Sequence, residues 1–94
     1  MNTRFTNRFE RDVERIVDVN VISDVEEAIK SVENARTLKD IPNLRKLRGY
    51  KEGIYYRIRI RRYRIGLTIV GGEASISCCD KKKFFYRDFP RIIR

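Results

Sequence analysis

The stretch YRIRIRRYRIG, residues 56–66, constrains the fold more than any other part of this chain. Apolar residues alternate with arginines on both sides of Arg61 and Arg62, and a period of two is typical of a β-strand with one apolar and one charged face. A two-residue loop at this arginine pair places Arg59 directly opposite Arg64. The stretch therefore predicts an antiparallel hairpin with a strongly basic face.

The basic face of this hairpin points to an anion ligand. Five arginines and no acid lie between residues 57 and 64, and like charges in directly opposed positions destabilise a sheet by about 0.2–1 kcal/mol. The alternative is that the arginines only solubilise an exposed sheet face and protect its edges. Surfaces with that role usually mix both signs of charge, so we favour an anion-binding face.

Two amphipathic helices are predicted in the first half of the chain. The first has a cap at Asn7 paired with Glu10, an apolar face and a solvated Asp12. Its apolar face consists of Phe9, Val13, Ile16 and Val17. The second has apolar residues at spacings of three and four from Ile22 to Ala35. Either Ser23 and Glu26 form its capping box, or it begins earlier and encloses them. Together the helices form a hairpin that needs a sheet to cover its apolar side.

The remaining patterns complete a single α+β domain over residues 1–94. Residues 2–5 can form a short first strand, and a turn at Gly71 and Gly72 joins the second strand of the basic hairpin to a further strand. In that strand Ala74, Ile76 and Cys78 alternate with polar residues or Cys79. We expect the helical hairpin to pack on one face of a small antiparallel sheet, a three-stranded meander with the short first strand, and Leu44 and Leu47 to lie between the two layers.

The charge distribution and the cysteine and histidine content of the chain limit the classes of partner and site that we expect. The net charge is +9, and residues 44–94 hold 15 Lys and Arg against 4 Asp and Glu, whereas residues 1–43 hold 7 against 9. Such polarised charge is typical of proteins that bind nucleic acid or an acidic partner. With no histidine and only the adjacent Cys78 and Cys79, neither a metal site nor a disulfide is expected. Without an apolar leader or a membrane-length run, we expect a cytoplasmic protein.

The stretch DKKKFFYRDFPRIIR, residues 80–94, combines three lysines with aromatic residues. Its rings can close over the core, but cations between aromatic residues are also how proteins bind single-stranded RNA. Histidine triads, phosphate loops and paired acids are missing from the basic half. Arg, Lys and Tyr suit RNA cleavage in which the 2′-hydroxyl attacks its own 3′ phosphate, because the substrate then supplies the nucleophile.

The run KLRGYKEGIYYRIRIRRYRIG together with the later KKKFFYRDFP resembles the RelE group of type II toxin-antitoxin toxins, within the RelE/ParE toxin superfamily. The resemblance covers nearly the whole chain. It implies a RelE-like α+β fold and a toxin that cuts messenger RNA, usually in the ribosomal A site, without cofactor or metal. It also implies a cognate antitoxin protein as partner. Three departures stand out. Arginines replace the lysines that well-studied members have on the strand, and the hairpin turn, often Gly-Asp in relatives, is Arg61-Arg62. Lys82 stands where the family usually has an arginine, with Lys81 and Lys83 as alternates.

Positions carried over from the family assign roles to individual residues. The resemblance implies a catalytic set of Arg57, Arg59, Arg64, Lys82 and Tyr86. Further RNA-binding residues are expected at Lys46, Arg48, Arg61, Arg62, Lys81, Lys83 and Arg87. One alternative is a non-nuclease module on the same scaffold, either a ParE-like gyrase inhibitor or an inactive homologue that binds RNA or antitoxin. Another is a basic face that serves only as the interface for an acidic antitoxin segment.

Overall fold

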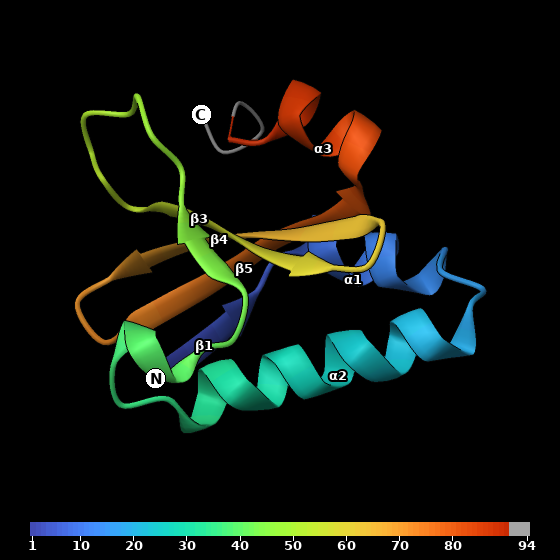
Figure 1. Ribbon diagram of the computed structural model, residues 1–94, viewed down its shortest axis with the longest axis horizontal. Coiled ribbons are helices and arrows are strands. Elements are labelled where there is room, and N and C mark those ends of the chain that lie inside the picture. The colour runs from blue at the N-terminus through green and yellow to red at the C-terminus, as the bar shows by residue number, and fades with distance from the viewer. Residues whose placement is uncertain (91–94) are drawn as a thin grey trace.

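The computed structural model describes residues 1–90, so residues 91–94 of the predicted C-terminal segment lie outside the described part (Figure 1). The strands are β1 (Asn2–Phe5), β2 (Leu44–Lys46), β3 (Tyr55–Ile60), β4 (Tyr63–Val70) and β5 (Glu73–Lys81). The helices are α1 (Asn7–Glu14), α2 (Val19–Asn34), the 3-10 helix η1 (Leu38–Asp40) and α3 (Lys82–Asp88). The strands form one sheet in the order β1-β5-β4-β3-β2. The predicted α+β class is confirmed.

The basic hairpin has the predicted register. Strands β3 and β4 pair with Arg59 opposite Arg64 and Arg57 opposite Gly66. In the turn, Arg61 has a φ of 52°, in the left-handed region that non-glycine residues rarely adopt. Its Nε donates a hydrogen bond to Asp24 Oδ2 of α2 at 2.7 Å. This bond and the charge of Asp24 raise the pKa of Arg61 and tie the turn to α2.

Two strands depart from the predicted antiparallel meander. Residues 2–5 do form a strand, but β1 pairs parallel with β5, from Asn2 opposite Glu73 to Phe5 opposite Ile76, so the sheet is mixed. The unpredicted β2 pairs antiparallel with β3 and forms the other edge of the sheet. With three residues, β2 is too short for alternation to be visible in the sequence.

Helix α1 differs from its predicted form at both ends. Its N-cap is Thr6, whose Oγ1 accepts a hydrogen bond from Phe9 N at 3.1 Å, so the predicted cap at Asn7 is wrong by one residue. The helix ends before the predicted apolar face does, which leaves Val17 88% exposed between the two helices. Asp12, predicted to be solvated, is buried.

Helix α2 begins before the candidate capping box. Asp18 is its N-cap, and the Asp18 Oδ1 accepts a hydrogen bond from Asn20 N at 2.8 Å. The helix therefore starts at Val19 and encloses Ser23 and Glu26, which decides between the two alternatives left by the sequence.

The helices lie on both faces of the sheet. Helices α1 and α2 cover one face and α3 lies over the other (Figure 1). In β5 a register shift opposite Gly66 and Leu67 leaves Ser77 as an extra residue, which is a β-bulge. The bulge reverses the alternation, so Cys79 joins the main core and Cys78 faces α3. The expectation that Cys78 continues the alternation of the preceding apolar residues is therefore wrong.

A second, smaller core lies beneath α3. Phe85 of α3 and Phe89, which directly follows the helix, pack with Cys78, and Leu47 is partly buried against them. Leu44 packs instead against the main core on the side of α1 and α2. The prediction that both leucines lie between the helical hairpin and the sheet is thus wrong for Leu47. Among residues 1–90, no helix combines the length and the apolar run that crossing a membrane requires.

Candidate nucleic-acid interface

The sheet face on the side of α3, which we name the outer face, concentrates the strand arginines. Arg45 of β2 lies directly opposite Arg57 of β3, and Arg59 of β3 lies directly opposite Arg64 of β4. Each opposed pair of like charges is destabilising by about 0.2–1 kcal/mol. Two such pairs on neighbouring strands mean that an anion bound on this face would relieve repulsion that is built into the sheet.

Arg64 differs from the other strand arginines because it is only 7% exposed. Its Nη1 donates to the carbonyl oxygens of Arg61 at 3.0 Å and Tyr63 at 2.8 Å. The buried Nε has no hydrogen-bond partner among the described residues. Asp80 is its cross-strand neighbour, yet no carboxylate oxygen of residues 1–90 lies within 4.0 Å of the guanidinium. Arg64 is thus a buried positive charge beneath the hairpin turn that forms no ion pair with an acid of residues 1–90.

The start of α3 and the hairpin turn enclose a basic cavity of about 680 Å³, which we name the Tyr86 cavity. The backbone N of Lys82 donates to Arg62 O at 2.7 Å and so fixes α3 to the turn. Tyr86 is 49% exposed, and its ring lies edge-on to Phe85 with centroids 4.8 Å apart. The cavity is lined by Arg61, Arg62, Lys81, Lys82, Lys83 and Tyr86, all of them residues predicted from the sequence.

Arg57 and Arg59 lie in a different cavity. A groove of about 420 Å³ at the β2 edge, which we name the β2 cavity, is lined by these two arginines with Arg45, Leu44 and Asn43. The Nη1 of Arg57 donates to the backbone carbonyl of Asn43 at 3.0 Å. The predicted catalytic set is therefore divided. Lys82 and Tyr86 line one cavity and Arg57 and Arg59 line the other, whereas the buried Arg64 of β4 is bonded to carbonyls at the hairpin turn.

Three of the predicted RNA-binding residues lie outside both cavities. Lys46 alternates with Arg45 and so belongs to the opposite side of β2, where its ammonium lies beside Gly53. Arg48 is exposed after β2. Arg87 places its guanidinium 5.2 Å from the centroid of the Phe84 ring. Of these three, Arg87 comes from α3, the helix that carries the Tyr86 cavity.

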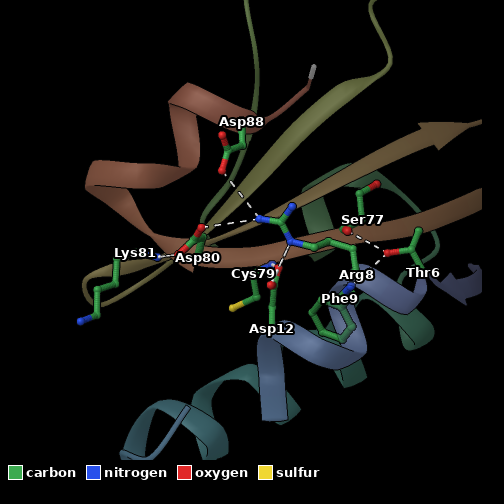
Figure 2. Close-up of polar contacts among 9 residues, drawn as sticks. All are labelled: Thr6, Arg8, Phe9, Asp12, Ser77, Cys79, Asp80, Lys81 and Asp88. Carbon is green, nitrogen blue, oxygen red and sulfur yellow. Dashed lines mark hydrogen bonds and ion pairs between the residues drawn. The ribbon is translucent and has the colours of Figure 1, made fainter. Parts of the chain in front are cut away.

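A partly buried ionic cluster that the sequence did not reveal connects α1 with β5 and α3. Figure 2 shows Arg8 of α1 reaching between Asp80 and Asp88, with Asp12 beside its Nε. Nε lies 3.0 and 3.1 Å from the two oxygens of Asp12, and Nη2 lies 3.7 Å from both Asp80 and Asp88. Burial lowers the pKa of Arg8, but the hydrogen bond and charge of Asp12 outweigh it, so the pKa is raised. Asp12 Oδ2 also accepts from Cys79 N at 2.9 Å.

The cysteines are not candidate nucleophiles. Burial raises the pKa of Cys78 and of Cys79 to about 12, so both thiols are protonated at neutral pH. The described part of the chain also has no group of three or more His, Cys, Asp or Glu side chains arranged to hold a metal ion. The chemistry of the outer face is therefore that of Arg, Lys and Tyr.

Comparison with known proteins gives a consistent picture. No family model matches the chain. It is 28% identical over 91 residues to Toxin RelE3 of Methanocaldococcus jannaschii, which covers 96% of this chain and 100% of that protein. A chain of the RelB-RelE antitoxin-toxin complex from Methanococcus jannaschii superposes with a TM-score of 0.76 at 25% identity, covering 93% of this chain and 99% of that chain.

A more distant structure shares the fold. The YoeB dimer from Staphylococcus aureus superposes with a TM-score of 0.68 at 23% identity, covering 85% of this chain and 94% of that one. The chain is therefore similar over nearly its whole length to Toxin RelE3 and to a chain of the RelB-RelE antitoxin-toxin complex, and it has a RelE-like fold.

Proposed function

We propose that this protein is the toxin of a toxin-antitoxin pair and acts in the cytoplasm as a metal-independent endoribonuclease on mRNA in the ribosomal A site. The observation that carries the proposal is the Tyr86 cavity, which gathers Lys82 and Tyr86 with four further cations over a volume of about 680 Å³. Cations beside an exposed ring suit a substrate with phosphates and bases. The whole-length similarity to Toxin RelE3 supports the same function.

In the proposed reaction the RNA supplies its own nucleophile. The 2′-oxygen bonds to the adjacent phosphorus, the bond from phosphorus to the 5′-oxygen breaks, and the products are a 2′,3′-cyclic phosphate and a 5′-hydroxyl. The 2′-hydroxyl loses a proton to a base and the leaving oxygen gains one. The protein contributes orientation, neutralisation of the developing charge and proton transfer.

Each predicted residue has a role consistent with its position. The buried Arg64 neutralises the scissile phosphate, and Arg57 and Arg59 contact the same RNA strand on the outer face. Lys82 lies at the leaving oxygen, and Tyr86 stacks on a base and orients the attack. A guanidinium keeps its proton at physiological pH, so the base is Tyr86, the lysine cluster or a ribosomal group.

The proposed inhibitor is a cognate antitoxin. One chain of the RelB-RelE antitoxin-toxin complex and one chain of the YoeB-YefM toxin-antitoxin complex from Staphylococcus aureus share the fold of this protein. An acidic antitoxin segment laid over the outer face would neutralise the arginines that RNA otherwise contacts. Such an interface is compatible with cleavage, because inhibitor and substrate would compete for the same charges.

The proposal is tested with purified protein and ribosomes that hold a defined mRNA codon in the A site. Primer extension should show cleavage at that codon. Lys82→Ala should slow it about 100-fold or more, as expected for loss of a proton donor. Tyr86→Ala should slow it more than Tyr86→Phe if the ring stacks on a base. Arg11→Ala, an exposed arginine on α1, is the charge-matched control and should cleave normally.

The gyrase alternative gives the opposite result. Intact mRNA together with gyrase-dependent DNA breaks in cells that express the protein would replace the nuclease proposal with a ParE-like activity. Intact mRNA without DNA breaks, when the ribosomes carry every codon in turn, would leave an inactive binding module.

A further inference from the structure

We propose that Arg45, Arg57 and Arg59 form a second phosphate-binding site in the β2 cavity, for a phosphate that flanks the scissile one on the same RNA strand. The inference rests on the proposed function in one respect, since it takes the Tyr86 cavity to be where the scissile phosphate lies. It adds Arg45, which was not among the predicted site residues, and it assigns Arg57 and Arg59 to the flanking phosphate.

The backbone carbonyl of Asn43 positions Arg57 and the backbone of Arg59 at the β2 edge of the sheet. Asn43 has a φ of 64°, a left-handed conformation that asparagine tolerates better than most residues. Its carbonyl oxygen accepts from Arg57 Nη1 at 3.0 Å and from Arg59 N at 3.4 Å. One nitrogen of the Arg57 guanidinium is thus fixed at the sheet edge, and the remaining donors of its planar fork are left for a ligand.

The charge of the site calls for an anion. Arg45 and Arg57 are directly opposed on neighbouring strands, and Arg59 lines the same cavity. Within residues 1–90, no Asp or Glu oxygen lies within 4.0 Å of the charged nitrogens of these three arginines. The lining contains no acid. Three cations that share one groove without a counter-charge repel one another, and a bound phosphate would neutralise them through charge-assisted hydrogen bonds.

Aromatic residues favour RNA over an acidic peptide as the occupant. A row of rings, each edge-on or stacked against the next at centroid distances of 4.8–6.1 Å, runs from the loop before β3 to α3. Its members in order are Tyr50, Tyr55, Phe89, Phe85 and Tyr86. The two ends are exposed, Tyr50 by 41% and Tyr86 by 49%. Exposed rings stack on the bases of RNA, whereas the carboxylates of an acidic peptide cannot stack on a ring.

The test compares short and long RNA analogues that cannot be cut. Fluorescent 2′-O-methyl oligonucleotides of two and of eight residues, which lack the attacking hydroxyl, are titrated with the full chain over a range of salt concentrations. We expect the dinucleotide to occupy the Tyr86 cavity alone and the octamer to reach the β2 cavity as well. Arg45→Ala should weaken octamer binding roughly threefold to tenfold and reduce the slope of log affinity against log salt by about 0.7. Dinucleotide binding should be unchanged.

Controls separate this effect from misfolding and from net charge. Arg45→Ala should be as stable as the wild type or slightly more stable in urea, because it removes a directly opposed like charge. Arg11→Ala loses the same charge from α1, on the opposite side of the sheet, and should bind both lengths normally.

Three results would overturn the inference. Octamer binding unaffected by Arg45→Ala would remove the site, and equal weakening of dinucleotide and octamer would place Arg45 at the Tyr86 cavity. Weaker binding of a decaglutamate peptide with unchanged RNA binding would assign the groove to an acidic protein segment. If the wild type shows the expected length and salt dependence but cuts no mRNA on ribosomes, the second site stands and the proposed nuclease function fails.

Discussion

Asp12 joins three parts of the molecule through one carboxylate. It accepts from Cys79 N of β5 and from Arg8 of α1, and Arg8 in turn lies 3.7 Å from Asp80 and from Asp88 of α3. A carboxylate that is 6% exposed is tolerated in a fold only where its hydrogen bonds replace those to water. The position of α3, and with it the Tyr86 cavity, thus depends on a residue outside the outer face.

Replacing this carboxylate should be costly. Asp12→Ala leaves the buried N–H of Cys79 without an acceptor and leaves the guanidinium of Arg8 with only its longer contacts to Asp80 and Asp88. We therefore expect a loss of about 3 kcal/mol in the free energy of unfolding, measured in urea. Glu14→Ala removes an exposed acid from the same helix and should change it by less than about 0.5 kcal/mol. Equal losses in the two variants would show that the contacts of Asp12 contribute nothing specific to stability.

The sequence could place some of these residues and not others. Arg59 opposite Arg64 was predictable because a period of two and a two-residue turn determine the register. The burial of Asp12 was not, because Arg8 and Asp12 are four residues apart and look like an exposed helical ion pair. Arg64 was predicted on the correct face, but the pattern did not reveal that its guanidinium bonds to the turn carbonyls.

The two cysteines should make the protein sensitive to alkali. Burial raises their pKa from an ordinary 9.0 to about 12. The unfolded chain therefore loses these protons at lower pH than the folded chain, so the contribution to stability is complete below pH 9 and is lost as the pH rises toward 12.

This pH effect is measured as the free energy of unfolding in urea at pH 8 and pH 10.5. The wild type should lose more stability over that interval than the double variant Cys78→Ala/Cys79→Ala, which has no thiols to ionise but keeps every lysine and tyrosine. The same loss in both proteins would mean that the thiols do not cause it.

Helix α3 is the element on which the proposed site depends most. Its start is bonded to the hairpin turn through Lys82 N and Arg62 O, and near its end Asp88 lies close to Arg8. In between, it packs so closely on β4 that a Cβ added at Gly66 would lie 2.8–2.9 Å from side-chain atoms. These atoms belong to Phe89, Cys78 and Phe85. Gly66 is required by this close approach.

Adding one methyl group here should displace the helix. Gly66→Ala should cost about 1–3 kcal/mol by overpacking, speed hydrogen exchange in residues 82–88 and weaken RNA binding at the Tyr86 cavity. Gly72→Ala is the matched control, because a Cβ at that position has no atom within 4 Å. Unchanged exchange in α3 of the Gly66 variant would contradict this account of how the helix is seated.

Among the helices and strands, the sequence predicted the two β-hairpins and the helices α1 and α2, because their patterns are local and repeated. It did not predict α3 as a helix, because alternating cations and rings fit a closing segment or an RNA contact equally well. The bulge at Ser77 and the parallel pairing of β1 depend on partner strands distant in the sequence.

For the whole molecule, uneven charge along the chain becomes uneven charge across the fold. Residues 1–43 are acidic on balance, whereas residues 44–94 carry a net charge of +11. The first part forms β1, α1 and α2, and the second forms β2 to β5 and α3 (Figure 1). The residues that line the Tyr86 cavity and the β2 cavity all come from the second part, except Asn43. The prediction of a polyanion partner from charge alone therefore corresponds to one face of the molecule.

Polyanion affinity should follow the position of a charge and not merely the net charge. The double variant Lys81→Ala/Lys83→Ala should elute from immobilised heparin at clearly lower salt than the wild type, because both lysines line the Tyr86 cavity. Arg11→Ala/Arg15→Ala removes the same charge from α1 and should elute close to the wild type. Equal shifts would show that heparin senses net charge alone.

The most direct test of the proposed chemistry is a single-atom change in the substrate. Ribosomes are programmed with two mRNAs that differ only in a 2′-deoxy nucleotide on the 5′ side of the A-site cleavage position, and the RNA ends are analysed. The unmodified mRNA should be cut to a 2′,3′-cyclic phosphate and a 5′-hydroxyl, and the 2′-deoxy mRNA should remain intact. Equal cleavage of both mRNAs would contradict attack by the 2′-hydroxyl.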